Sequence, residues 1–230
     1  MPRALKSIIR LPARPSGRRQ SPKQGPARPA GQGPRDVLPR YLTQEDLGRF
    51  RRAVVAQDVA RDIALFGVMY RYGLRAVEVT YLVSEDLELD IKRRRIRIRR
   101  AKHGHPKEYP LASDLVPALK RYMRVRLERG PYLFTGRESN NQHGLRVLQV
   151  QRLFKHYAHA AGLAAEVSSH SLRHSIAVHS LEEGFGLEYV ADLLGHTSIR
   201  STAIYAQVTT PAREAMIKRL DRSRHVVSWR

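Results

Sequence analysis

Apolar positions recur at helical spacing at the start of residues 41–112 and then change to strict alternation. Thr43 followed by Asp46 is typical of a helix start, because a threonine oxygen and an acidic first turn both stabilise free backbone N–H groups. Residues 63–72 are mostly apolar and are followed by Gly73. This pattern indicates a second, largely buried helix with a glycine at its end.

The alternating stretch predicts a small sheet. Apolar residues alternate with acids in a first strand and with arginines in a second (Leu87, Leu89 and Ile91; Ile96 and Ile98). The second strand is therefore expected to have one apolar face and one row of guanidinium groups. Residues 103–106 supply a turn signal, and 108–111 are expected to return as a short third strand. Beyond Ser113 the pattern indicates helices separated by Gly and Pro breaks.

Residues 1–40 follow neither pattern. They contain eight of the 13 prolines, and ten Lys and Arg residues against one acid, Asp36, for a net charge of +9. A segment with few apolar residues and a high net charge cannot bury enough surface to fold, so we interpret it as a disordered, basic, Pro-rich arm. It is either a solubilising tail or a segment that contacts phosphates. Residues 41–230 are expected to form one globular domain.

The chain as a whole is strongly basic, with 42 Lys and Arg residues against 21 acids and a net charge of +21. Such an excess indicates a polyanionic partner. The absence of cysteine excludes a disulfide scaffold, a thiol nucleophile and a thiolate metal site. No apolar run approaches the roughly 18 residues that span a bilayer, and no secretory signal is recognised. We therefore expect a cytoplasmic, nucleic-acid-facing protein without membrane association.

Three cationic residues stand at positions that suit a phosphate. Arg75 follows the glycine break and opens a short helix, so its side chain can lean into a cleft. His170 and Arg173 are three positions apart and share a helix face, close to a helix start where backbone N–H groups also favour an anion. Cleaving a phosphodiester without a metal requires fixed cations on the non-bridging oxygens. Arginine suits this role because its planar fork binds two oxygens and stays charged.

With these residues the chain resembles the tyrosine recombinases, also called phage-type integrases. The resemblance covers roughly residues 41–220 and rests on five pieces in the family's order, which together are far more specific than any one alone. In sequence they are the run from Tyr72 to Glu78 (YGLRAVE), Lys102 at a hairpin tip, the run from His170 to His174 (HSLRH), Leu194-Gly195-His196, and Tyr205 nine residues after His196.

The resemblance implies a fold that is mainly α with a small antiparallel β-sheet (α+β). It implies a site-specific DNA recombinase, of integrase or invertase type, that works through a 3′-phosphotyrosyl intermediate. Since the covalent ester retains the bond energy, no metal, ATP or other cofactor is expected. The resemblance implies that Tyr205 is the nucleophile. Arg75 and Arg173 would hold the phosphate oxygens, and His196 would add a hydrogen bond there. His170 would accept the tyrosine proton, and Lys102 would donate a proton to the leaving 5′-oxygen.

Some of these assignments have rivals within the chain. Lys107 is the alternative to Lys102 as the acid, with Lys102 then reduced to a phosphate contact. Tyr157 and Tyr189 rival Tyr205 on generic grounds, but neither follows a histidine at the same spacing.

Two neighbours of the implied catalytic residues are given supporting roles. Glu78, one turn after Arg75, is interpreted as a structural partner that holds the helix start. His174, one turn after His170, is expected to pack against the site or orient it. Histidine pairs at helical spacing lack carboxylates in a zinc-protease pattern, so no metal site is predicted (His170 and His174; His156 and His159).

Most members of the family carry a separate helical DNA-binding domain before the catalytic domain, and only the 40-residue arm stands there in this chain. The expected partner is double-stranded DNA, bound by a homotetramer on two sites with a possible accessory DNA-binding protein, in association with the nucleoid. Alternatives are a type IB topoisomerase that relaxes supercoils and a catalytically idle DNA-binding regulator. A basic ribosome-associated protein would explain the charge but not the motifs.

Overall fold

Helix α1 (Gln44–Ala56) begins at the predicted cap. The Thr43 hydroxyl accepts a hydrogen bond from the Asp46 N–H at 3.1 Å, and the Asp46 carboxylate accepts one from the Thr43 N–H at 3.3 Å. Helix α2 (Ala60–Arg71) ends just before Gly73, whose φ of +57° lies in the left-handed region that favours glycine. Both predicted helices are confirmed, and α2 begins three residues earlier than the apolar run indicated.

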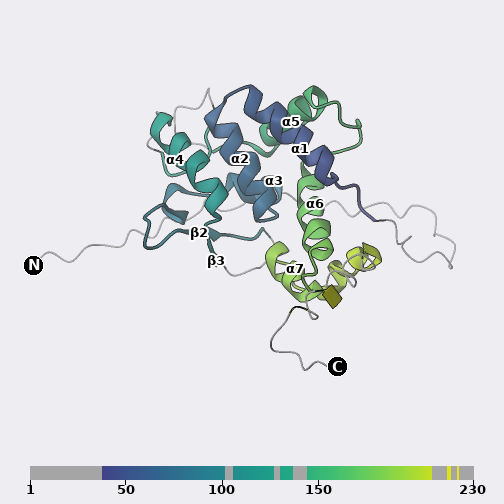
Figure 1. The fold of residues 1–230 in the computed structure, drawn as a ribbon. Coiled ribbons are helices and arrows are strands. Elements are labelled where there is room, and N and C mark those ends of the chain that lie inside the picture. Colours follow the sequence, from purple (N-terminus) through teal and green to yellow (C-terminus); the bar gives the residue numbers. More distant parts are fainter. Residues whose placement is uncertain are drawn as a thin grey trace, which may run out of the picture. The chain divides into compact units, whose positions relative to one another are not determined.

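The computed structural model describes residues 38–101, 106–126, 130–136 and 144–208, together with 217, 218 and 222 (Figure 1). The predicted arm, residues 1–40, lies outside these ranges except for its last three residues. Lys102 and residues 103–105 of the predicted turn also lie outside them.

The helical part of the core is built around α2, which packs against α4 (Val116–Val125) and α6 (Ser169–Glu182), while α1 packs against α5 (Val147–Ala160). Figure 1 shows α6 running from this group of helices toward α7 (Leu187–Leu194). Four buried aromatic rings join α1, α2 and α5, with ring centroids 5.0–6.5 Å apart (Phe50, Phe66, Phe154 and Tyr157). Burial of these rings fixes how the helices pack against one another.

The predicted sheet is present, but its first strand is shorter than expected. The order is β1 (Leu87–Glu88), β2 (Arg95–Ile98) and β3 (Lys107–Pro110), antiparallel throughout. Ile96 and Ile98 are fully buried, as the alternation predicted. Ile91 is 76% exposed, because the chain turns away after β1 instead of continuing the strand.

The row of arginines on the outer face of β2 is partly neutralised by acids of neighbouring elements. Arg97 pairs with Glu108 of β3 at 2.8 Å, and Arg99 pairs with the buried Asp86 of the 3₁₀ helix η1 (Ser84–Asp86) at 3.0 Å. These arginines are therefore not a continuous free cationic surface.

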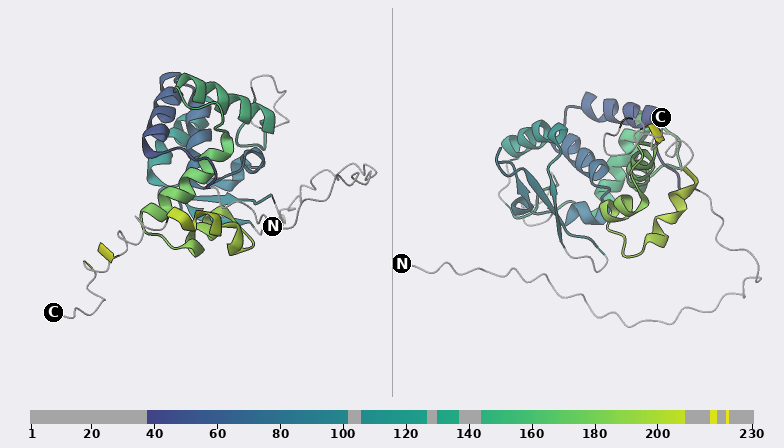
Figure 2. Two further views of the ribbon diagram at one scale, coloured as in Figure 1. Left: turned by 90° about the vertical axis from the view of Figure 1, so that its right-hand side faces the viewer. Right: turned by 60° about the horizontal axis from the view of Figure 1, so that its bottom comes forward.

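Helix α7 lies beside the sheet (Figure 2). Lys107 of β3 forms an ion pair with Asp192, and the Tyr109 hydroxyl donates to the Asp192 carbonyl at 3.3 Å. A second apolar cluster, from α6, α7 and the segment after them, includes Tyr205. The sequence indicated one helix opening near Ser198, whereas the structure has two short 3₁₀ helices, η3 (Ile199–Ser201) and η4 (Ala203–Val208).

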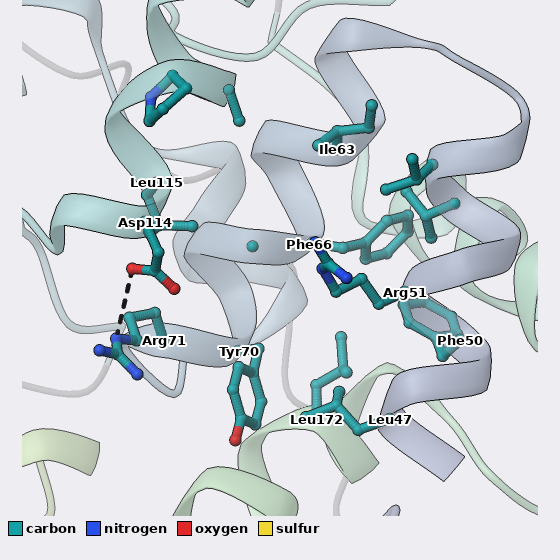
Figure 3. Close-up of a pocket in the computed structure, with 15 residues that line it drawn as sticks. Leu47, Phe50, Arg51, Ile63, Phe66, Tyr70, Arg71, Asp114, Leu115 and Leu172 are labelled. Carbon is teal, nitrogen blue, oxygen red and sulfur yellow. Dashed lines mark ion pairs between the residues drawn. The ribbon is translucent and has the colours of Figure 1, made fainter. Parts of the chain in front are cut away.

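A hollow between α1, α2 and the start of α4 is mostly apolar, and Leu47, Phe66 and Leu172 are among the residues lining it (Figure 3). Charged residues also line this hollow: Arg71 and Asp114 form an ion pair at 3.9 Å. None of the implied catalytic residues that the structure describes lines this hollow, so we place the candidate site elsewhere. Among the described residues, no helix is both long and apolar enough to cross a membrane.

Candidate active site

Arg75 is the N-cap of the short helix α3 (Ala76–Thr80), directly after the turn at Gly73. Its backbone N–H donates to one oxygen of Glu78 at 2.9 Å, and its guanidinium donates to the other oxygen at 2.7 Å. The side chain of Glu78 is fully buried, whereas that of Arg75 keeps 24% of its surface exposed. The interpretation of Glu78 as a structural partner agrees with this geometry: the carboxylate fixes the arginine from within and leaves one side of it open.

Arg173, on α6, is held from three sides. Its guanidinium donates to the carbonyl of Gly73 at 2.6 Å and to that of Leu194 at 2.8 Å, and it lies 3.8 Å from a carboxylate oxygen of Glu78. Burial, followed by the charge of Arg75, lowers the pKa of Arg173 to about 10. The group still carries its charge at neutral pH, so Arg75 and Arg173 form a pair of fixed cations around one carboxylate.

Arg100 is a third arginine on Glu78 that the sequence reasoning missed. Its side chain is almost fully buried, donates to Glu78 at 3.2 Å and to the Tyr72 carbonyl at 3.2 Å, and also donates to the Leu193 carbonyl. A Cβ at Gly195 would stand 2.7 Å from the Arg100 side chain, so the glycine makes room for it. The signal was present in the sequence, because alternation places Arg100 on the same face as Ile96 and Ile98.

Glu78 remains ionised although it is buried. Burial by itself would raise the pKa of Glu78, but the backbone hydrogen bond from Arg75 and the charges of Arg100 and Arg173 together lower it below its ordinary value. One negative charge is thus shared by three guanidinium groups, and the cluster keeps a net positive charge suited to an anion.

We expect Arg100→Met to reduce the free energy of unfolding by about 3–5 kcal/mol, because it breaks a buried ion pair and leaves two buried carbonyls without their donor. Urea denaturation followed by circular dichroism measures this loss. The matched control is Arg97→Met, which removes an equally long arginine from an exposed ion pair on β2, three residues before Arg100, and should change the midpoint little. Equal urea midpoints for the two variants would contradict the conclusion that the buried contacts of Arg100 stabilise the fold.

Two of the implied catalytic histidines lie near the arginine pair. His196 follows α7, and its Nδ1 lies 2.8 Å from the Thr202 hydroxyl. Burial, then the charges of Arg173 and Arg75, lower the pKa of His196 to about 4, so it is neutral at physiological pH. His170 stands in the first turn of α6, exposed on one side and partly covered on the other. That partial burial, followed by the charges of Arg173 and Arg75, lowers the pKa of His170 as well.

Tyr205 is 1% exposed, and its hydroxyl lies 2.5 Å from Nδ1 of His174. Burial raises the pKa of Tyr205 to about 12, although the charges of Arg173 and Arg75 act in the opposite direction. Both guanidinium groups are therefore within electrostatic reach of the hydroxyl. The sequence pattern indicated only a packing or orienting role for His174, yet this residue makes the direct contact with the Tyr205 hydroxyl.

The rivals of these residues are engaged elsewhere. Tyr157 donates to the buried Asp62 at 2.8 Å, and Tyr189 is 49% exposed and stacks on Phe185. Lys107 is paired with Asp192. In the part of the chain that the structure describes, no group of three or more His, Asp or Glu side chains could hold a metal ion.

The structure thus brings together Arg75, Arg173, His170, His196 and Tyr205 in one region, joined by Glu78 and Arg100. The shared carboxylate and the electrostatic effects on the pKa values of His196 and Tyr205 link them. Lys102, two residues after Arg100, lies outside the described residues, so its place as proton donor stays a prediction.

Comparison with known proteins agrees with this arrangement. The model of the phage integrase family matches residues 40–211. The chain is 33% identical over 183 residues to tyrosine recombinase XerA of Pyrococcus furiosus, covering 80% of this chain and 62% of the relative. It is 34% identical over 176 residues to tyrosine recombinase XerC of Neisseria gonorrhoeae, covering 74% of this chain and 56% of that protein.

Among solved structures, the crystal structure of XerA recombinase has a TM-score of 0.66 and 27% identity, and the match covers 82% of this chain and 67% of that one. A post-cleavage complex of XerH recombinase with a palindromic difH substrate also has a TM-score of 0.66, at 23% identity over 80% of this chain and 54% of that one, which shows the fold alone. The chain spans about three fifths of the length of the curated relatives it matches.

Proposed function

Because this chain belongs to the phage integrase family, we propose that it is a tyrosine-type site-specific DNA recombinase that breaks and rejoins DNA through a 3′-phosphotyrosyl intermediate. The observation that carries the proposal is the cluster in which Arg75 and Arg173 share the buried carboxylate of Glu78 and act electrostatically on the Tyr205 hydroxyl. Two fixed cations beside a nucleophilic oxygen suit attack on a phosphodiester.

In the proposed step, a non-bridging phosphate oxygen lies against each guanidinium and His196 supplies a further hydrogen bond. The Tyr205 oxygen forms a bond to phosphorus, and the bond from phosphorus to the 5′-oxygen breaks. Negative charge grows on the non-bridging oxygens during the step, so arginines already held in place by carbonyls and by Glu78 stabilise the transition state without having to reorganise.

Two protons move in this step. Lys102 is proposed to protonate the leaving 5′-oxygen, as a lysine can and an arginine cannot readily do. The phenolic proton goes to a histidine of α6. The sequence resemblance assigns that role to His170, and the structure places His174 against the hydroxyl. Both histidines are on one helix face, four residues apart.

Double-stranded DNA is the proposed substrate. The excess of basic residues supports this, and so do neighbours whose structures hold DNA, such as the Tn1549 transposon integrase in complex with transposon right-end DNA. A homotetramer acting on two sites and an accessory DNA-binding protein are part of the same proposal, as is association with the nucleoid. A topoisomerase would instead relax plasmids of any sequence.

The proposal is tested by incubating the full chain, in EDTA, with nicked duplexes covering the DNA around its own gene. A nick close to the cleavage point lets the short 5′-hydroxyl fragment diffuse away and traps the covalent protein–DNA adduct. We expect an adduct on a restricted set of duplexes. Failure to form an adduct on any of them, or formation only after metal is added, would contradict the proposal, and relaxation of unrelated supercoiled plasmids would favour the topoisomerase.

The basic segment 1–40 is proposed to contribute phosphate contacts. Each neutralised phosphate adds about −0.9 to the slope of log K against log salt, so about four contacts would add 3–4 units. A chain starting at Arg40 should therefore show a slope flatter by that amount in a salt titration, with similar losses on site and non-site DNA. An unchanged slope would mean that the segment only improves solubility.

A further inference from the structure

The hydroxyl of the proposed nucleophile has a specific partner in the protein. Nδ1 of His174 lies 2.5 Å from the Tyr205 oxygen, and the two rings are tilted by 48° with centroids 5.9 Å apart. The contact joins α6 to η4 across 31 residues of sequence. His174 is half-buried and Tyr205 is buried, so little water competes for this hydrogen bond.

The ionisation of the two groups determines which one donates. Burial, then the charges of His170 and Arg173, lower the pKa of His174 to about 4, so its imidazole is neutral at physiological pH. Burial raises the pKa of Tyr205 to about 12, so its phenol is protonated. The phenol O–H therefore donates and Nδ1 accepts, which places the histidine proton on Nε2.

We propose that His174, rather than His170, receives the phenolic proton when Tyr205 attacks DNA. The inference rests on the proposed recombinase function and deepens it. As the bond from the Tyr205 oxygen to phosphorus forms, the proton moves to Nδ1 of His174 and gives an imidazolium. The bond from phosphorus to the 5′-oxygen breaks, and that oxygen takes a proton from Lys102.

The position of His170 supports the assignment of the phenolic proton to His174. Its side chain is exposed in the first turn of α6, and among the described residues it makes no hydrogen bond to Tyr205. An exposed imidazole beside Arg173 at a helix start is placed to contact a phosphate oxygen instead. His174 lies one turn further into the helix, on the side of the nucleophile.

Binding of DNA would make His174 a better base than it is in the free protein. Burial and neighbouring positive charges disfavour its imidazolium in the absence of DNA. A phosphodiester held by Arg75 and Arg173 brings a negative charge into the same region, which favours the protonated histidine.

The test compares single-turnover adduct formation by the unmodified chain, His174→Asn and the matched control His170→Asn on one nicked duplex. The asparagine amide oxygen can take the place of Nδ1 as hydrogen-bond acceptor but cannot take the proton. We expect His174→Asn to slow adduct formation by about 10²-fold or more while DNA binding stays within a few-fold.

A second measurement separates proton transfer from packing. Tyr205 is replaced, by stop-codon suppression, with a ring-fluorinated tyrosine whose phenol is more acidic. Such a phenol depends less on a base. The factor by which His174→Asn slows adduct formation should therefore be at least several-fold smaller with the fluorinated tyrosine, whereas the factor for His170→Asn should stay the same. The opposite pattern would assign the base to His170 and overturn the inference.

The experiment distinguishes failure of the role proposed for His174 from failure of the proposed recombinase function. An adduct formed equally fast by His174→Asn overturns the role of His174 alone, and no adduct from the unmodified chain overturns the proposed function and the inference with it. NMR of isotope-labelled histidine in the unmodified chain provides a check that needs no folded His174 variant. We expect an unprotonated Nδ1 at His174 whose signal shifts in Tyr205→Phe, and a proton on Nδ1 would overturn the inference.

Discussion

Tyr205→Phe is expected to abolish the covalent protein–DNA adduct completely while DNA affinity stays within a few-fold. The substitution removes only the oxygen that we propose forms the bond to phosphorus, and it keeps the buried ring that belongs to one apolar cluster with Ile176, Val178 and Leu194. The loss of one hydrogen bond to His174 costs about 1 kcal/mol, too little to unfold the domain.

The measurement is denaturing electrophoresis of labelled nicked DNA after incubation with each protein, alongside a gel-shift titration for affinity. Tyr189→Phe is the matched control, since Tyr189 is exposed and its ring stacks on Phe185. It should form adduct at the normal rate. An adduct from Tyr205→Phe would place the nucleophile on another residue.

Lys102→Ala is expected to slow DNA cleavage by about 10²–10⁴-fold, the range for loss of a general acid. The physical reason is that an alkoxide is a poor leaving group unless it is protonated as the bond to phosphorus breaks. A substrate with sulfur in the 5′-bridging position should restore the rate, because a thiolate leaves without a proton.

The structure argues against Lys107 as the acid in place of Lys102. The side chain of Lys107 forms an ion pair with Asp192 on α7, and the hydrogen bond that its ammonium donates to that carboxylate raises the pKa of Lys107 above its ordinary value. A lysine whose ammonium is stabilised in this way gives up its proton less readily. Lys107→Ala should therefore leave the cleavage rate nearly unchanged, and a sulfur rescue seen for Lys107→Ala but not for Lys102→Ala would reverse the assignment.

Much of the local structure could be predicted from particular residues. Thr43 and Asp46 marked the start of α1, Gly73 marked the end of α2, and Ile96 with Ile98 marked the buried face of β2. Each signal works because the hydrogen bonds and burial it reports involve residues only a few positions apart. The expected first strand was too long for the same reason: alternation near Ile91 indicates a strand, but not whether a partner strand lies beside it.

The order of motifs in the sequence was enough to indicate the family and to name Arg75, Arg173, His196 and Tyr205 as candidate residues. Residue types alone restrict what each can do: an arginine holds its charge on a phosphate and a phenol can act as a nucleophile, whatever the surrounding fold. These candidate residues could therefore be proposed from the sequence itself.

Only the tertiary structure decided how these residues are held. Arg173 donates to Gly73 across 100 positions, Arg100 reaches Leu193 across 93, and Tyr205 meets His174 across 31. Such contacts depend on how α6 packs on α2 and how the sheet lies beside α7, which is set by the combined burial of many side chains. A short sequence pattern does not report the combined burial of so many side chains. For that reason the sequence named the candidate nucleophile, while the buried carboxylate shared by three arginines and the histidine on the phenol were visible only in the folded chain.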